Sequence, residues 1–171
     1  MNKETKIFLI ISLLVIILII YLGFQEPSEP QEFVKNKTFS NYSTLFFDYE
    51  ISRYPSSVEI KPLEILNENI TLGFVTDPWN INFGIIPGNG TLVKRTVELT
   101  NLKDENSKVI LRTYGNISPL VSFSKNNFIM HPHEKVSIEI SLYDNDTKRM
   151  NYTGEIDVIS KKAIYNFLPI S

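Results

Sequence analysis

The residues from Ile7 to Phe24 form an apolar run, and this run constrains the chain more than any other feature. Ser12 and Tyr21 are its only polar side chains. A helix of about 18 residues is about 27 Å long, which nearly matches the roughly 30 Å hydrocarbon core of a bilayer. A cleavable export signal has a shorter apolar region that ends in small residues, whereas the exit here is bulky. We expect a retained transmembrane helix over residues 7–24, with an exported protein whose signal is cleaved as the alternative.

The charges that flank the run predict its orientation. Lys3 and Lys6 precede it, whereas Glu26, Glu29 and Glu32 follow it. Positive charge is retained on the cytoplasmic side of a membrane. Residues 1–6 are therefore expected as a cytoplasmic tip of a single-pass cell-membrane protein, and the rest of the chain after the run is expected outside.

Acceptor triplets for N-glycosylation, N-x-[ST], support export because all of them lie beyond the apolar run. The candidate sites are Asn36, Asn41, Asn69, Asn89, Asn116, Asn145 and Asn151. An Asn- and Thr-rich β-protein can also place such residues together in turns for backbone reasons. Asn116 is expected to be the poorest acceptor, because Pro119 restrains the residue before it.

Composition excludes several classes of protein. The chain has 17 basic and 19 acidic residues, and its basic residues occur as scattered pairs, so the footprint of a nucleic-acid-binding protein is missing. The absence of cysteine removes disulfides, thiol-linked lipid anchors and the commonest structural zinc sites. The fold must therefore depend on its core.

Residues 25–44 contain two prolines and alternating charges without sustained apolar periodicity. Proline-rich segments tend toward extended polyproline II conformation, at about 3 Å per residue. We expect an extended spacer that holds the following domain, residues 45–171, clear of the lipid headgroups.

Period-two alternation begins at residue 45 and indicates β-strands. Residues 45–52 place Leu45, Phe47, Tyr49 and Ile51 on one face. The clearest strand covers residues 136–143, with Ile138 on an apolar face and Glu139 facing outward. Further strands are expected at "TVELT", "KVILRTY", "PLVSFS", "NNFIMH" and "GEIDVIS", separated by turns rich in Gly, Asn and Asp. This spacing predicts an all-β domain, an antiparallel immunoglobulin-like sandwich of about 7–9 strands, preceded by the one transmembrane helix.

The segments "INFGIIPGNGTLVKRTVELTN", "FIMHPHEKVSIEISL" and "NYTGEIDVIS" resemble immunoglobulin-like domains of the major sperm protein and ASPM-SPD2-Hydin type. The resemblance covers roughly residues 79–160, and the membrane anchor departs from that family. It implies a binding or scaffold module with no catalytic residues. Within it, Phe83 is expected in the core, and Gly84 is expected at a bulge or a close approach of a neighbouring strand.

Candidate chemistry is sparse. His131, His133 and Glu134 carry metal-ligand side chains, but the intervening proline indicates a solvated turn. A nucleophilic triad has only these two histidines to draw on, and the acids are expected at outward strand positions or in turns, which leaves no carboxylate pair. Trp79 is expected in the core or at the rim, with ligand stacking as a minor alternative. We predict no catalytic, cofactor-binding or metal-binding residues, and no enzyme.

The function that these features predict is a membrane-anchored binding or structural module at the cell envelope. Its expected partners are membrane lipid through residues 7–24 and a protein or surface polymer. The alternative is a subunit of a membrane machine, such as a stator-like component of an archaeal-type motility filament.

Overall fold

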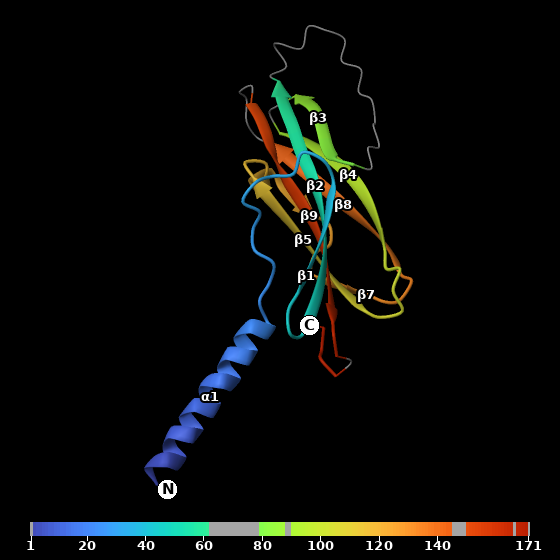
Figure 1. Ribbon diagram of the computed structural model, residues 1–171. Helices are drawn as coiled ribbons and strands as arrows, with labels where there is room; N and C mark the ends of the chain where they lie inside the picture. Colours follow the sequence, from blue (N-terminus) through green and yellow to red (C-terminus); the bar gives the residue numbers. More distant parts are fainter. Residues whose placement is uncertain (1, 62–78, 88–89, 145–149, 166, 171) are drawn as a thin grey trace.

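The computed structural model describes the chain except for residues 1, 62–78, 88–89, 145–149, 166 and 171. An N-terminal helix, α1 (Lys3–Gly23), is followed by a β-domain (Figure 1). The strands are β1 (Thr38–Ser43), β2 (Phe47–Lys61), β3 (Ile81–Pro87), β4 (Thr91–Thr100), β5 (Ser107–Gly115), β6 (Val121–Phe123), β7 (Phe128–Met130), β8 (Lys135–Asp144) and β9 (Met150–Ala163). A short 3-10 helix, η2 (Ser118–Leu120), precedes β6.

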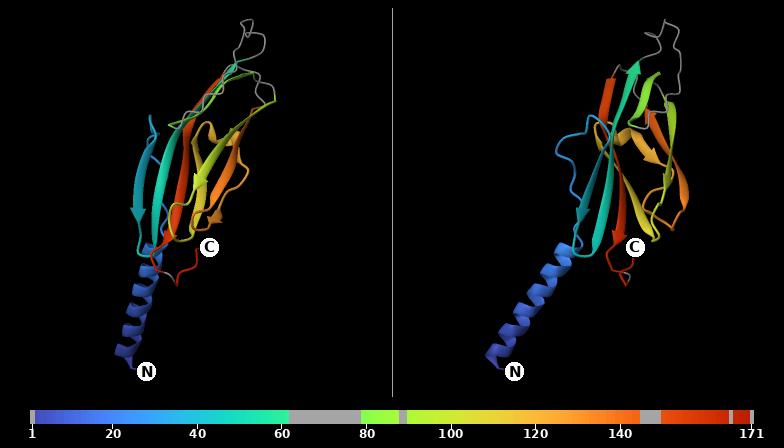
Figure 2. Two further views of the ribbon diagram at one scale, coloured as in Figure 1. Left: turned by 90° about the vertical axis from the view of Figure 1, so that its right-hand side faces the viewer. Right: turned by 45° about the vertical axis from the view of Figure 1, so that its right-hand side comes forward.

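Helix α1 is apolar around its whole circumference and projects away from the domain (Figure 2). Asn2 begins it as an N-cap, accepting a hydrogen bond from the Thr5 amide at 2.9 Å. Within the described residues, this is the one helix long and apolar enough to cross a membrane. It can serve as an anchor or as an export signal.

Two sheets make up the domain. Sheet A has the order β1-β2-β9-β5-β7, and β3 pairs with the second half of β2. Sheet B has the order β4-β8-β6. The pairs are antiparallel except for β2 and β3, which are parallel. The all-β class with one N-terminal helix is therefore confirmed, with this parallel pair as a departure from a purely antiparallel sandwich.

The sandwich core lies between the two sheets. Ile156 of β9 and Ile60 of β2 pack with Ile140 and Leu142 of β8, and Ile117 before η2 seals the end of this cluster. The predicted inward face of residues 136–143 is confirmed, since Ile138, Ile140 and Leu142 are all buried. This core follows from the period-two alternation in β8.

The expectation for Phe83 and Gly84 holds. Phe83 is buried, and Gly84 has a φ of +77°, which a residue with a Cβ rarely adopts. The parallel register between β2 and β3 shifts between Ser57 and Glu59, so Gly84 belongs to a bulge. No atom would meet a Cβ at this position within 4 Å, so close strand approach is not its role.

Residues 25–44 differ from the expected extended spacer. Their second part forms β1, which pairs with β2 from Thr38↔Arg53 to Ser43↔Asp48. Their first part runs beside sheet A (Figure 1), and Pro27 within it is buried. Leu45, expected on the buried face of a strand, is instead exposed in the β1–β2 turn.

Candidate functional site

The end of helix α1 is docked into the β1–β2 turn. The Thr44 hydroxyl donates a hydrogen bond to the Gly23 carbonyl at 3.0 Å, and the Phe47 amide donates to the same hydroxyl at 3.0 Å. The Phe24 ring meets Phe46 and Phe47 edge-on, with centroids 5.3 and 5.6 Å away. These contacts join the helix and the domain directly.

Gly23 is required at this junction because the helix and the Phe46 ring approach closely. A Cβ built on Gly23 would lie 2.1 Å from Cδ2 of Phe46. That distance is far inside van der Waals contact, so any larger residue would force the Phe46 ring away. We call this contact of Gly23 and Phe24 with Thr44, Phe46 and Phe47 the anchor junction.

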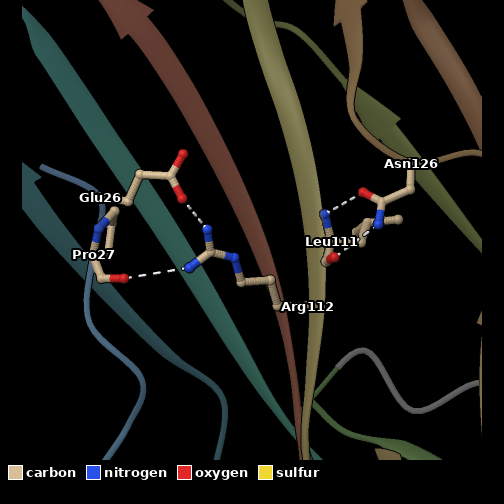
Figure 3. Close-up of polar contacts among 5 residues, drawn as sticks. All are labelled: Glu26, Pro27, Leu111, Arg112 and Asn126. Carbon is tan, nitrogen blue, oxygen red and sulfur yellow. Dashed lines mark hydrogen bonds and ion pairs between the residues drawn. The ribbon is translucent and has the colours of Figure 1, made fainter. Parts of the chain in front are cut away.

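Beyond the anchor junction, the chain covers the face of sheet A that points away from sheet B. The Arg112 guanidinium of β5 donates to the Pro27 carbonyl at 3.3 Å and forms an ion pair with Glu26 (Figure 3). The Val34 amide donates to Oε2 of Glu155 at 2.8 Å. Residues 25–37 are thus held at both of their ends by the outer face of the sheet.

A buried charge cluster lies beneath this covering segment. The cross-strand register places Asp157 of β9 between Arg53 of β2 and Arg112 of β5, and Glu155 occupies the next position on the same face. The Arg53 Nε lies 3.8 Å from Glu155 Oε1 and 3.9 Å from Asp157 Oδ2. Glu155 and Asp157 are only 0% and 3% exposed. We call these four residues the buried charge cluster.

The pKa of Asp157 is raised from 3.8 to about 7, chiefly by burial and also by the neighbouring Glu155 carboxylate, whereas the two arginines oppose the shift. Oε1 of Glu155 and Oδ1 of Asp157 are buried without a hydrogen-bond partner among the described residues. Asp157 therefore titrates near neutral pH.

The expectation that the acids lie on the surface is wrong for Asp144, which is buried at the end of β8. It is also wrong for Glu155 and Asp157. Their alternation with Ile156 and Val158 in β9 assigns them to the outward face of the sheet, which is correct. That face is not solvent, because residues 25–37 cover it. No local signal in β9 reveals a cover that is more than 100 residues away in the sequence; the Val34–Glu155 pair is 121 residues apart.

An outer apolar cluster continues the covered face toward the helix. It contains Phe47, Tyr49 and Ile51 of β2 with Ile159 and Ala163 of β9. Leu168 and Ile170 of the C-terminal segment pack against it. Burial raises the pKa of Tyr49 to about 12, and burial lowers the pKa of Lys161, whose ammonium lies 3.9 Å from the centroid of the Phe47 ring.

Asn126 is a structural residue that the sequence did not indicate. Its side-chain amide donates to the Leu111 carbonyl at 2.9 Å, and its Oδ1 accepts from the Leu111 amide at 2.7 Å (Figure 3). The pairing of β5 with β7 ends at Val109. The Asn126 side chain thus continues the hydrogen bonding of the strand edge where β7 has ended.

The histidines lie in an exposed turn between β7 and β8, as expected. His131 Nδ1 lies 3.0 Å from Asn106 Oδ1, and His133 Nε2 lies 2.9 Å from Asp104 Oδ1. Glu134 accepts a hydrogen bond from the His131 amide. Over the described part of the chain, no group of three His, Cys, Asp or Glu residues could hold a metal ion.

The acceptor asparagines are only partly described. Asn36, Asn41, Asn116 and Asn151 are exposed, whereas Asn69, Asn89 and Asn145 lie outside the described residues. The side chain of Asn116 accepts a hydrogen bond from the Thr153 amide at 2.6 Å, and the next residue, Ile117, is fully buried. Trp79 is 63% exposed, so it lies outside the core.

Comparison with protein-family models, with curated protein sequences and with solved structures finds no match to this chain. The fold and the site define an all-β protein that carries one apolar N-terminal helix docked against its sandwich.

Proposed function

We propose that this protein is a single-pass membrane-anchored module that presents an extracytoplasmic β-sandwich for binding or support at the cell envelope. The anchor junction carries this proposal. A cleavable export signal ends in small residues, whereas Tyr21, Leu22 and Phe24 are bulky, and both Gly23 and Phe24 contact the domain. A docked helix end favours an anchor that stays attached.

The direct junction also favours a structural role over a loose tether. A domain held by its helix end and by residues 25–37 has a defined orientation relative to the anchor. Such a domain would bind its partner, a protein or a surface polymer, at a fixed height above the bilayer. We expect such a partner, and no catalytic activity.

The orientation of the helix is part of the proposal. Lys3 and Lys6 before it, and the acceptor triplets after it, favour a cytoplasmic N-terminus and an outside domain. The resemblance of the sequence to domains of the major sperm protein and ASPM-SPD2-Hydin type also favours binding or scaffolding.

A second candidate is a load-bearing subunit of a membrane machine, such as a stator-like component of an archaeal-type motility filament. The anchor junction favours it too, because force on the domain would pass directly into the helix. The two candidates differ in the partner that each would contact.

Three measurements test the proposal. Protease added outside should digest the domain while a tag at Met1 stays protected, and mass spectrometry of the membrane-bound protein should find residues 1–24 still attached. In-cell crosslinking should then recover cell-surface proteins or polymers for a surface module, or a multi-subunit motor for the machine component. A mature protein that begins after residue 24 would contradict the anchor.

A further inference from the structure

The end of the sandwich nearest helix α1 carries exposed apolar side chains from two distant parts of the chain. Leu45, in the β1–β2 turn, is 49% exposed. Ile164, Tyr165 and Phe167, after β9, are 40%, 46% and 79% exposed. The rings of Tyr165 and Phe167 stack with their centroids 5.6 Å apart. Grouped apolar side chains at a surface mark contacts with proteins or membranes.

Hydrogen bonds connect this surface to the end of the helix. The Ile164 amide donates to the Phe46 carbonyl at 2.9 Å, and Thr44 in the same turn donates to the Gly23 carbonyl. The Leu168 amide bonds to the Tyr165 carbonyl at 3.0 Å, which closes the C-terminal turn. The exposed side chains therefore lie beside the residue at which α1 ends.

If α1 crosses a bilayer, this position determines how deep the exposed apolar side chains lie in it. Residues 7–24 span about 27 Å, so their outer end reaches the boundary between hydrocarbon and headgroups. The β1–β2 turn, which contacts Gly23, and the C-terminal turn, which contacts Phe46, then lie at that boundary. Aromatic side chains are enriched at this level of membrane proteins.

Other loops at the same end of the domain lie farther from the helix. The β4–β5 loop and the β7–β8 turn, which carry the exposed Asp104–His133 pair, lie away from α1 in Figure 1. Single exposed apolar side chains occur there too, such as Leu102 at 81%, but the surface formed by the β1–β2 turn and the segment after β9 lies on the side where the anchor leaves the domain. This placement fits a bilayer that meets only the edge nearest α1.

We propose that Leu45, Ile164, Tyr165 and Phe167 form a second membrane contact, which inserts into the interfacial layer of the bilayer beside helix α1. The inference rests on the proposed function, because it needs α1 to span the membrane. The domain would then rest on the lipid surface, and its tilt would be fixed at two points.

Depth-dependent fluorescence quenching tests this contact in the full-length protein. Trp79→Phe removes the only native tryptophan, and Phe167→Trp then places a single reporter at an exposed position that has room for it. The protein is reconstituted into phosphatidylcholine vesicles whose acyl chains are brominated either near the headgroup or near the bilayer centre. We expect a blue-shifted emission and a loss of intensity that is larger with bromine near the headgroup.

Two further reporters make the result decisive. Leu92→Trp, at an exposed apolar position of β4 far from the helix, should show neither quenching nor shift. Leu14→Trp, in the middle of α1, should be quenched most by bromine near the bilayer centre. Quenching at position 14 without quenching at position 167 would overturn the second contact alone, whereas no quenching at position 14 would overturn the membrane anchor itself.

Gly23→Leu provides an independent check, because it drives the Phe46 ring away from the helix end. In this variant the reporter at position 167 should lose its quenching while the reporter at position 14 keeps it. A blue-shifted but unquenched reporter at position 167 that crosslinks to a second copy, or to another protein, would assign the surface to a protein partner and overturn the lipid contact.

Discussion

Sheet A is buried on both of its faces, but by different means. Near the far end of the domain its inner face packs against sheet B through residues such as Val58 and Ile60. Near the helix its outer face holds Phe47, Tyr49 and Ile51. The apolar positions of β2 therefore change from odd to even numbers along one strand, because a different face is covered at each end.

The two faces also differ in what they bury. The inner face is mainly aliphatic, with Phe83 as its buried aromatic residue, whereas the outer face combines aromatic rings with Glu155 and Asp157. The inner face needs only complementary shape from sheet B. The outer face is covered by an irregular segment that brings an amide donor from Val34, while Arg53 and Arg112 supply positive charge. Polar residues can be buried where the cover supplies their partners.

The largest expected effect comes from the inner face. Ile156→Ala removes a fully buried side chain from the core, and we expect a loss of roughly 2–5 kcal/mol in the free energy of unfolding. Chemical denaturation of the full chain in detergent micelles measures it. Leu92→Ala, on an exposed position, is the control and should change stability by about 0.5 kcal/mol or less. Equal losses would show that the two-sheet core is wrongly assigned.

Removing charge from the covered outer face should cost somewhat less. Arg53→Met leaves Glu155 and Asp157 without their nearest cation, and we expect a loss of about 2–3 kcal/mol at pH 8. Lys94→Met breaks an ion pair with Glu139 on the exposed face of sheet B and should change stability far less, because solvent screens this pair. If both variants behaved alike, the outer face would be open to solvent.

The same cluster predicts an unusual dependence of stability on pH. With the pKa of Asp157 at about 7 in the folded state and near 3.8 in the unfolded state, the folded chain keeps a proton that the unfolded chain has lost. Its contribution to stability therefore falls as pH rises from about 4 to about 7, by at most about 1.4 kcal/mol per pH unit. Asp157→Asn should remove this slope and make the protein more stable than wild type at pH 8. A parallel pair of stability–pH curves would contradict the shifted pKa.

The smallest effect is expected at the rim of the covering segment. Glu26→Gln removes the ion pair with Arg112, but half of the Glu26 side chain is exposed, so solvent screens the interaction. We expect a loss of about 0.5–1 kcal/mol that disappears at high salt. Glu29→Gln, at an exposed neighbouring position, should have no measurable effect. A loss as large as that of Arg53→Met would mean that Glu26 belongs to the buried charge cluster.

Local pattern was sufficient to predict the helix, most of the strands and the buried side of β8. It was insufficient for features that depend on contacts between distant parts of the chain. The parallel pairing of β3 with β2, the strand β1 within the expected spacer and the burial of Glu155 all require a partner far away in the sequence. The sequence also did not reveal the close contact of Gly23 with Phe46 at the anchor junction, because a glycine at a helix end usually marks only a C-cap.

The covering segment also has a consequence for the order of folding. Residues 25–37 are made before the strands that they cover, β5 and β9; Glu26 and Arg112 are 86 residues apart. Strand β2 likewise waits for β9, with which it pairs from Phe47↔Ala163 to Ile60↔Met150. Such non-local pairing makes folding slow. Strands β1 and β3 can pair with β2 early, but the edge of β2 that meets β9 stays open until β9 itself has been synthesised.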